Sequence, residues 1–358
     1  MTLRYTSIDA HAEGEPGRVI VDMDDLVPGA TIAERFDYAT QHLHDFRRLV
    51  LHEPRGYPGL CAVLALTPSD PRADVAIIVM EQGAFTPMSG SNTMCTVTAL
   101  LESGRIPMVE PVTTVTVETA VGLVRVEARC EAGKVTAVTI SNVPAFAVHL
   151  GVPLTLPTDP RVDPPGSDLT IPVDIAFGGQ FFVLARAEDL GVGFEPSDVP
   201  RLTSLGARLK LAVNQAYRVQ HPLNPDIDDV NLVMITGPSP GPGIDGRNAM
   251  VMATDQLSDD PATWTGALDR SPCGTGTCAR MACMHARGEL GLDQPFVHMG
   301  MLGTTFTGRL VSETTVGDYA AVLPTITGRA WVTGASEWVL DESDPFPEGY
   351  TIGDIWPA

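Results

Sequence analysis

The sequence predicts a mixed α/β (α+β) protein built from two similar halves. Both halves show the same order of patterns, in which strands, a helix, strands, a second helix and further strands follow one another. A short motif of the first half, 89–104, returns in the second half at 273–288. With 358 residues, the chain is long enough for each half to have its own hydrophobic core. We therefore expect an internal duplication and two domains.

The predicted domains are 1–150 and 151–333. The loop-rich stretch 150–166, which contains several prolines, is the expected boundary between them. The tail beyond about residue 334 is expected to cross back to the first domain.

The first half begins with two predicted strands joined by a polar turn, EGEPGR at 13–18. The stretch 31–50 has the apolar spacing of an amphipathic helix, and a second helix follows Ser89. The remaining strands are indicated by runs of β-branched and apolar residues. The predicted strands of this half are 3–9, 18–23, 60–66, 74–81, 113–120, 122–130 and 134–144.

The second half repeats this order after the predicted boundary. Its first helix is expected over 196–218 and its second over 277–287, with Gly288 at the position typical of a helix C-terminus. Strands are again indicated by β-branched residues. They are predicted at 170–176, 180–186, 230–236, 248–253, 304–313, 319–328 and 329–340.

The composition argues against a nucleic-acid or membrane partner. The formal net charge is −21, whereas nucleic acids and anionic membranes require basic patches. The N-terminus has no apolar segment of signal-peptide length, and no run approaches the ~20 residues of a membrane span. Six cysteines are scattered along the chain, which fits a reduced, cytoplasmic protein better than a disulfide-stabilised one.

The stretch SPCGTGTCARMACMHARG, residues 271–288, contains the strongest candidate for chemistry. Cys273 lies just before the helix, where unpaired N–H groups and the positive end of the helix dipole meet. This environment lowers the pKa of a thiol and favours the thiolate, which can act as a base. Gly274 and Gly276 leave the same N–H groups accessible to a carboxylate or another anion. Cys273 is therefore a candidate catalytic residue, with an inert buried thiol as the alternative.

The matching stretch of the first half is SGSNTMCTVTALLESG, residues 89–104. A shift of 184 residues brings Ser89 onto Cys273, and three of the sixteen positions are then identical. Both stretches have a proline upstream, a small nucleophilic side chain, a glycine, small polar residues, an apolar helix and a closing glycine. We therefore expect the duplication to bring two helix N-termini to one site, with Ser89 as the partner of Cys273. A simple N-cap serine is the alternative.

Asp269 stands four residues before Cys273. A carboxylate at this position could accept hydrogen bonds from a substrate ammonium, while the alternative is a solvated turn residue. Helix N-termini that bind a carboxylate, together with an acidic group for an ammonium, would suit an α-amino or α-imino acid.

No cofactor is expected from the motifs. The segment 274–279, GTGTCA, matches the dinucleotide pattern G-x-G-x-x-A, but that pattern requires an apolar strand directly upstream, and TGALDRSP stands there instead. Cys273, Cys278 and Cys283 recur every five residues, so each is turned about 140° from the last on a helix and they cannot converge on one metal ion. Cys278 and Cys283 are expected in the core.

Several motifs together resemble the proline racemase family over nearly the whole chain. They are IDAHAEGEPGR (8–18), PMSGSNT (87–93), FGGQFF (177–182), DRSPCGTGTCARMA (269–282), LGTTFTGR (302–309) and TITGRAWVTG (325–334). That family includes 4-hydroxyproline 2-epimerases and trans-3-hydroxy-L-proline dehydratases. The resemblance implies a diaminopimelate-epimerase-like fold, in which two pseudo-symmetric domains each wrap a mixed or antiparallel sheet around a central helix. It also implies that no cofactor is needed.

The resemblance further implies roles for the site residues. Racemases of the family use two cysteines, one from each domain, that face opposite sides of the substrate Cα. By position these correspond to Ser89 and Cys273 here. The residues that would hold the substrate are Gly90, Ser91, Asp269, Gly274 and Thr275.

Two positions depart from the family pattern. The first catalytic cysteine is Ser89 here, and the histidine often found after the glycine is Ser91. A hydroxyl is a poor base near neutral pH because its pKa lies far above that of a thiol. Because the Ser/Cys pairing resembles the dehydratases, we expect dehydration of trans-3-hydroxy-L-proline to Δ1-pyrroline-2-carboxylate. The alternatives are proline racemisation or 4-hydroxyproline 2-epimerisation, also as a side activity, and a non-catalytic imino-acid-binding protein. The sequence leaves a homodimer open.

Overall fold

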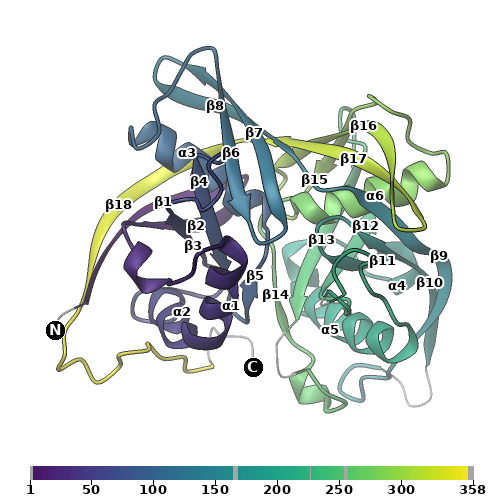
Figure 1. The fold of residues 1–358 in the computed structure, drawn as a ribbon. Coiled ribbons are helices and arrows are strands. Elements are labelled where there is room, and N and C mark those ends of the chain that lie inside the picture. The colour runs from purple at the N-terminus through teal and green to yellow at the C-terminus, as the bar shows by residue number, and fades with distance from the viewer. Residues whose placement is uncertain (1–2, 164–167, 226, 254–256, 354–358) are drawn as a thin grey trace. The chain divides into compact units, whose positions relative to one another are not determined.

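The structure is a computed structural model that divides into two compact units (Figure 1). The first unit contains the chain up to Ser141 together with the segment that begins at Thr327. The second unit is the continuous stretch from Asn142 to Ile326. The residues that the structure describes are 3–163, 168–225, 227–253 and 257–353.

The boundary after Ser141 lies earlier than the predicted stretch 150–166. Strand β9 (Ala145–Leu156) is the reason, because it pairs along its length with β10 of the second unit. Pro153 of β9 stands opposite Pro172 in this pair, and prolines within a run argue against a strand when only the sequence is considered. Part of the predicted boundary, 164–167, lies outside the described residues.

The first unit contains a curled sheet, one central helix and two outer helices. Its strands are β1 (Leu3–Ala12), β2 (Glu15–Val21), β3 (Cys61–Leu66), β4 (Val75–Met80), β5 (Phe85–Thr86), β6 (Val112–Thr119), β7 (Gly122–Glu131), β8 (Lys134–Ser141) and β18 (Ala330–Leu340). Its helices are the short η1 (Asp24–Leu26), α1 (Ile32–His42), α2 (His44–Leu51) and α3 (Gly90–Glu102).

The strands of the first unit pair in the order β18–β1–β2–β3–β4–β6–β7–β8. The pairs β2–β3 and β4–β6 are parallel, and the others are antiparallel. Helix α3 contacts β18, β1 and β2 at one end of this order and β7 and β8 at the other. The sheet therefore curls around α3, whose residues from Gly90 to Leu101 are all buried.

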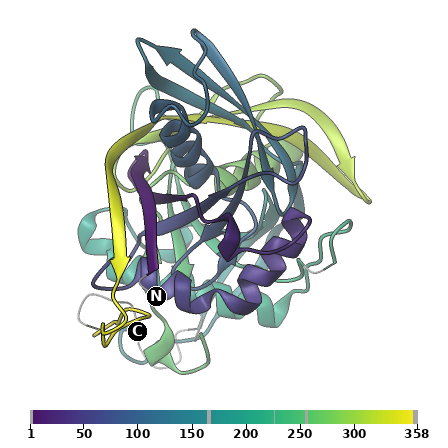
Figure 2. The same cartoon turned by 60° about the vertical axis from the view of Figure 1, so that its left-hand side comes forward.

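Strand β18 comes from the C-terminal part of the chain and pairs with β1 from Leu3↔Leu340 to Ala12↔Ala330. Figure 2 shows the two strands, coloured yellow and purple, side by side. The chain returns to the first unit as expected, but at Thr327 rather than near residue 334, so the strand predicted at 329–340 belongs to the first unit and not to the second. The hydrogen bonds to β1 place the whole strand in the first unit, so the crossing occurs before it.

The second unit has the same kinds of element. Its strands are β9 (Ala145–Leu156), β10 (Leu169–Phe177), β11 (Phe181–Arg186), β12 (Leu232–Gly237), β13 (Gly246–Ala253), β14 (Gly266–Leu268), β15 (Phe296–Met299), β16 (Thr305–Val316) and β17 (Tyr319–Gly328), the last of which ends beyond the boundary. Its helices are α4 (Ala187–Leu190), η2 (Pro196–Asp198), α5 (Val199–Ala216), η3 (Pro261–Thr263) and α6 (Gly274–Ala286).

The strands of the second unit repeat the topology of the first. They pair in the order β9–β10–β11–β12–β13–β15–β16, which matches β18–β1–β2–β3–β4–β6–β7 strand by strand, and β17 pairs with β9 at the edge. The parallel pairs are β11–β12 and β13–β15, which correspond to β2–β3 and β4–β6. The short strand β14 pairs with β13 as β5 pairs with β4. Helix α6 contacts β9, β10, β11 and β16 as the central helix, and α5 packs on β12 and β13. The two units are therefore pseudo-symmetric, as predicted.

Both faces of the first sheet are covered. Strands β3 and β4 are buried at every position, which requires cover on both sides. Leu64 and Ile78 pack in one apolar cluster with Phe46 and Leu49 of α2.

Among the described residues, no helix is both long and apolar enough to cross a membrane.

Two predicted helices differ in the structure. The stretch 31–50 is not one helix, because it bends at Leu43, which ends α1 and precedes α2. The bend buries Leu43 in the apolar cluster beside Phe46. Helix α6 begins at Gly274 rather than at Thr277, since the glycine-rich segment is already helical.

Candidate active site

The central helices α3 and α6 are equivalent in length and in both of their ends. Each has 13 residues, and Ser89 and Cys273 occupy their N-cap positions. Each helix is followed by a glycine with positive φ, which is 76° at Gly104 and 73° at Gly288. The shift of 184 residues predicted from the sequence thus relates the two helices from cap to cap.

A threonine one turn into each helix makes the same contact with the cap. The hydroxyl of Thr93 donates to the carbonyl of Ser89 at 2.7 Å. The hydroxyl of Thr277 donates to the carbonyl of Cys273, also at 2.7 Å. The duplication therefore includes the side-chain bond that fixes each cap residue on its helix.

Ser89 is a conventional N-cap whose oxygen accepts hydrogen bonds. Its backbone is extended, with φ −141° and ψ 127°. Its Oγ accepts from the Nδ2 of Asn92 at 3.0 Å and from the backbone N–H of Asn92 at 3.5 Å. The Oγ of Ser91 lies 3.4 Å away. A hydroxyl has one proton and two acceptor sites, so the Ser89 hydroxyl is left to act as a donor.

Cys273 has a different backbone conformation from Ser89. Its φ is 60° and its ψ is 103°, so it lies at positive φ but outside the ordinary left-handed region. For a residue with a Cβ, such a conformation raises the energy by an estimated ~1–3 kcal/mol, and it persists only where the surroundings impose it. Strained backbone of this kind often marks functional sites.

The Cys273 thiol lies over the first turn of α6 and packs against apolar side chains. It is buried with Phe182 and Met234 in one cluster. A Cβ added to Gly276 would lie 3.0 Å from the Sγ, and the Oγ1 of Thr275 is 3.9 Å from the Sγ. The glycine therefore allows the sulfur to approach the helix backbone, where the dipole favours negative charge.

Asp269 shapes the loop that leads to Cys273. It is buried, and its Oδ1 accepts from the backbone N–H of Ser271 at 2.7 Å. The Oγ of Ser271 in turn accepts from the backbone N–H of Cys273 at 3.1 Å. Asp269 is thus a buried carboxylate rather than a solvated turn residue.

The predicted site residues gather within their own units. In the first unit, Ser89, Gly90 and Ser91 form the start of α3. In the second unit, the loop before α6 and its first turn bring the others together, namely Asp269, Cys273, Gly274 and Thr275.

In each unit a glycine lies against the central helix, Gly17 in strand β2 and Gly178 in the turn between β10 and β11. A Cβ added to Gly178 would lie 2.2 Å from the carbonyl oxygen of Thr275 and 2.5 Å from the nitrogen of Ala279. A Cβ added to Gly17 would lie 3.0 Å from the Cβ of Cys95 in α3. The backbone of FGGQFF, which contains Gly178, therefore packs directly on the first turns of α6.

The other cysteines near these helices are inert core residues, as predicted for two of them. Burial raises the pKa of the Cys278 thiol to about 12. Burial also raises the pKa of the Cys283 and Cys95 thiols. A thiolate is therefore not available at these three positions near neutral pH.

A buried polar group beside α6 was not predicted from the sequence. His298 of β15 lies 2.8 Å from the hydroxyl of Thr277 and 2.8 Å from the Nη1 of Arg280. No spacing in the sequence links these residues. The contacts depend on the parallel pairing of β13 with β15, in which Gly246 stands opposite His298.

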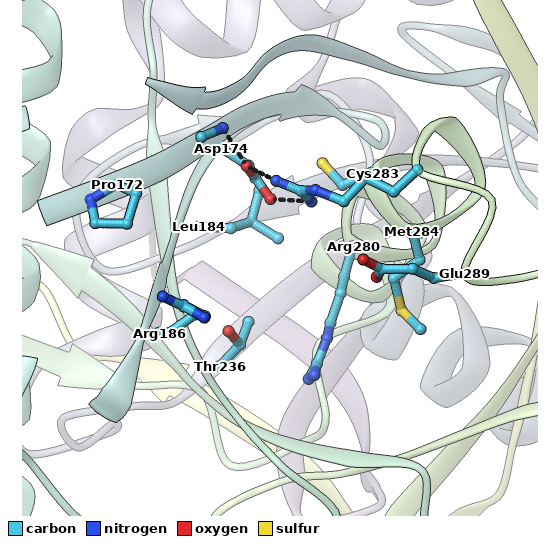
Figure 3. A pocket seen from close by; sticks show the side chains of 11 residues that line it. Pro172, Asp174, Leu184, Arg186, Thr236, Arg280, Cys283, Met284 and Glu289 are labelled. Carbon is cyan, nitrogen blue, oxygen red and sulfur yellow. Dashed lines mark hydrogen bonds and ion pairs between the residues drawn. The ribbon is translucent and has the colours of Figure 1, made fainter. Parts of the chain in front are cut away.

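A cavity of about 370 Å³ opens at the other end of α6 (Figure 3). Arg280, Cys283 and Arg287 line it, and Arg287 pairs there with Asp174. Cys283 lies ten residues after Cys273, which is about 15 Å along a helix axis. This cavity is therefore separate from the cap of α6. In the described part of the chain, no cluster of three potential metal ligands occurs.

The chain is similar to known proteins along nearly its whole length. The family model described as proline racemase matches residues 7–351. The 4-hydroxyproline 2-epimerase of Streptosporangium roseum is 40% identical over 348 residues, which cover 97% of this chain and 98% of that protein. The proline racemase of Clostridioides difficile is 37% identical over 346 residues, which cover 97% of each protein.

The same similarity is found among solved structures. A crystal structure of a hydroxyproline epimerase from Agrobacterium vitis, with bound trans-4-hydroxy-L-proline, has a TM-score of 0.88 and 36% sequence identity to this chain. The match covers 99% of this chain and 96% of that one. The two-unit fold is therefore shared from end to end.

Proposed function

The chain belongs to the proline racemase family, and from this premise we propose that it removes the Cα proton of a proline-type imino acid with Cys273 as the base. The observation that carries the proposal is the position of this residue. Its thiol lies over the first turn of α6, next to Gly276, on a backbone strained to φ 60°. The N-terminus of α6 stabilises a thiolate.

The start of α6 is also suited to the charge that develops on the substrate. When the Cα proton leaves, negative charge spreads to the carboxylate, and donors that face this group stabilise the transition state. We assign the backbone N–H groups of Gly274 and Thr275 to the substrate carboxylate in the second unit, and those of Gly90 and Ser91 in the first. We assign the carboxylate of Asp269 to the ring ammonium. These assignments are proposals, as is the action of Ser89 and Cys273 on the same substrate molecule.

The first candidate reaction is 2-epimerisation of 4-hydroxyproline. The names of the relatives support it, since they are a 4-hydroxyproline 2-epimerase and a proline racemase. These names put epimerisation ahead of the dehydration that the sequence analysis favoured. In this reaction the Cys273 thiolate removes the Cα proton from one face. The hydroxyl of Ser89, which receives two hydrogen bonds from Asn92, returns a proton to the opposite face. The Ser89 oxygen then regains a proton from water, and the Cys273 thiol releases its proton to water, which restores the starting state.

The second candidate is dehydration of trans-3-hydroxy-L-proline, which the serine itself supports. Elimination requires one base and one proton for the departing hydroxyl, and a donor hydroxyl can supply the proton. The Cys273 thiolate takes the Cα proton, the electron pair forms the Cα–C3 double bond, and the C3–O bond breaks. The leaving oxygen receives a proton from Ser89 or from the Cys273 thiol and departs as water. The enamine product tautomerises to Δ1-pyrroline-2-carboxylate.

One panel of substrates separates these reactions. The purified protein is incubated with L-proline, trans-4-hydroxy-L-proline and trans-3-hydroxy-L-proline, and both optical rotation and pyrroline formation are followed. We expect turnover of 4-hydroxyproline to its 2-epimer, with pyrroline formed from the 3-hydroxy isomer if the second candidate also operates. A protein that dehydrates but does not epimerise would reverse the order of the candidates. A protein that binds these compounds and turns over none of them would contradict both.

A further inference from the structure

A chain of buried hydrogen bonds runs from the middle of α6 to the backbone of Cys273. Nη1 of Arg280 lies 2.8 Å from Nε2 of His298, and Nδ1 of His298 lies 2.8 Å from the hydroxyl of Thr277. That hydroxyl donates to the carbonyl of Cys273 at 2.7 Å. We propose that His298 and Thr277 are positioning residues, which hold the Cys273 thiol in the conformation that proton transfer requires.

The direction of the chain follows from its donors. A guanidinium can only donate, so Arg280 makes Nε2 of His298 an acceptor. The proton of a neutral imidazole must then be on Nδ1, which donates to the oxygen of Thr277. This leaves the hydroxyl proton of Thr277 for the carbonyl of Cys273. Arg280 therefore favours the tautomer of His298 with its proton on Nδ1, and in this tautomer every link of the chain has one donor and one acceptor.

The chain requires a neutral histidine, and its surroundings keep it neutral. His298 and Thr277 are both fully buried. Burial lowers the pKa of His298 well below its ordinary value, and the charge of Arg280 lowers it further. A protonated His298 could not accept from Arg280 and would place two cations in contact.

Thr277 and its neighbour Asn248 hold the peptide groups on both sides of Cys273. The Thr277 hydroxyl lies 3.1 Å from the carbonyl of Pro272 as well as 2.7 Å from that of Cys273. Nδ2 of Asn248 donates to the carbonyl of Pro272 at 3.0 Å. A residue at φ 60° and ψ 103° relaxes unless its neighbouring peptides are fixed. These bonds therefore supply the constraint that keeps the sulfur over the helix.

The first unit provides an internal comparison. Thr93 makes the same bond to the carbonyl of Ser89, and within the described residues no histidine hydrogen-bonds to it. Ser89 needs no such support, because its backbone is in the ordinary extended region at φ −141°. The histidine thus accompanies the strained cap and is missing at the relaxed one, which is expected if its role is to maintain the strain.

The test measures the reactivity of the Cys273 thiol rather than turnover alone. The rate at which iodoacetamide alkylates Cys273 is followed by mass spectrometry across pH for the wild type and for Thr277→Val, Thr277→Ser and Thr93→Val. Without the hydroxyl, we expect Thr277→Val to raise the midpoint of the alkylation profile by about one pKa unit and to lower kcat about tenfold, with KM changed much less. Thr277→Ser should restore both values, and Thr93→Val should leave the alkylation midpoint of Cys273 unchanged.

His298 is tested in the same way with two replacements. The amide of His298→Asn can still donate to Thr277, whereas His298→Leu cannot, so Asn should keep the midpoint closer to the wild type than Leu does. Thermal unfolding is measured for every variant. The proposal would be overturned if Thr277→Val and Thr277→Ser shifted the alkylation midpoint and lowered kcat to the same extent. The same holds if His298→Asn and His298→Leu had equal effects, because only packing would then matter.

The inference rests on the proposed function only for the use made of the thiol. If the wild type turned over no imino acid but its alkylation profile still depended on the Thr277 hydroxyl, the proposed function would fail and the positioning role would stand. If the wild type turned over an imino acid but Thr277→Val left the alkylation profile of Cys273 unchanged, the proposed function would stand and the positioning role would fail.

Discussion

Gly276 lies directly under the sulfur of Cys273, since a Cβ at this position would be 3.0 Å from the Sγ. The same Cβ would be 2.3 Å from the Cε of Met234. An alanine must therefore displace the thiol or the methionine. We expect Gly276→Ala to lower kcat about tenfold or more, because a small misplacement of a reacting group has a large effect. Steady-state kinetics and the iodoacetamide rate check this, and unchanged values for both would mean that the Met234 side chain moves aside while the sulfur stays in place.

The Cys273 thiol should be the reactive one among the buried cysteines. Iodoacetamide should modify Cys273 and abolish turnover, while Cys278 and Cys283 stay unmodified in the folded protein because burial raises their pKa. Pyrrole-2-carboxylate, a planar mimic of the deprotonated substrate, should slow the modification. Peptide mapping by mass spectrometry identifies the modified residue. Near-normal turnover in Cys273→Ala would remove this residue from the mechanism.

Replacement of Ser89 should change the balance of the two candidate reactions. A thiol at this N-cap can act as a base, whereas the hydroxyl cannot near neutral pH. We expect Ser89→Cys to raise epimerisation of 4-hydroxyproline about tenfold or more, most of all in the direction that starts from the D-configured epimer. Ser89→Ala is the control and should lower epimerisation. Polarimetry from both epimers provides the measurement, and equal epimerisation rates in all three proteins would exclude a role for Ser89.

Asp269 should affect substrate affinity more than the fold. If its carboxylate binds the ring ammonium, Asp269→Asn removes a charge-assisted hydrogen bond, which is worth about 1.5–3 kcal/mol and thus about tenfold to a hundredfold in Kd. Calorimetric titration with pyrrole-2-carboxylate and with L-proline compares a ligand without a ring ammonium to one that has it. Only the second should bind more weakly. Similar losses for both, with a large drop in Tm, would assign Asp269 to the loop alone.

Gly178 should contribute to stability because a side chain at this position would meet the backbone of α6. An added Cβ would lie 2.2 Å from the carbonyl oxygen of Thr275, which belongs to the helix backbone and cannot move aside. We expect Gly178→Ala to lower the free energy of unfolding by about 1–3 kcal/mol. Gly241→Ala is the matched control, because nothing lies within 4 Å of its added Cβ. Thermal denaturation of the two variants gives the comparison.

The buried His298 predicts a stability that falls in acid. Burial holds its pKa well below the ordinary value of 6.5, so the folded state binds fewer protons than the unfolded state below that pH. The contribution of the neutral His298 to the free energy of unfolding is fully present above pH 6.5. Below pH 6.5 this contribution falls by up to about 1.4 kcal/mol per pH unit for one proton.

Comparison with His298→Asn isolates this contribution from those of other groups. Arg280 is the charged residue that contacts the ring, and Thr277 and Asn248 are neutral. Urea unfolding between pH 5 and pH 8 should give a shallower dependence in the variant. The same slope in both proteins would mean that the histidine titrates alike in the folded and unfolded states.

Local patterns were enough to predict the parts of the fold that depend on neighbouring residues. The spacing of Ser89–Gly104 against Cys273–Gly288 identified both central helices and both caps, because caps and closing glycines are determined within one or two turns. The bend at Leu43 and the strand that contains Pro153 were missed. Both depend on packing against a sheet, which local propensity does not contain.

The candidate site was predicted in the same uneven way. The cap residues could be found because glycine, serine and cysteine stand in a recognisable order at a helix start. His298 could not be found, since only the pairing of β13 with β15 brings it to Thr277. The strained φ of Cys273 could not be predicted either, because the presence of a cysteine in the sequence does not indicate its backbone conformation.

The pairing of β18 with β1 has a consequence for synthesis on the ribosome. The second unit is one continuous stretch and can complete its sheet while the chain is still being made. In the first unit, β1 is made at the start, but one of its edges stays without a partner until residues 330–340 have left the exit tunnel. An open strand edge invites pairing with other chains, so β1 is exposed to association while the residues between β1 and β18 are translated. The unit that is begun first is therefore the one that is finished last.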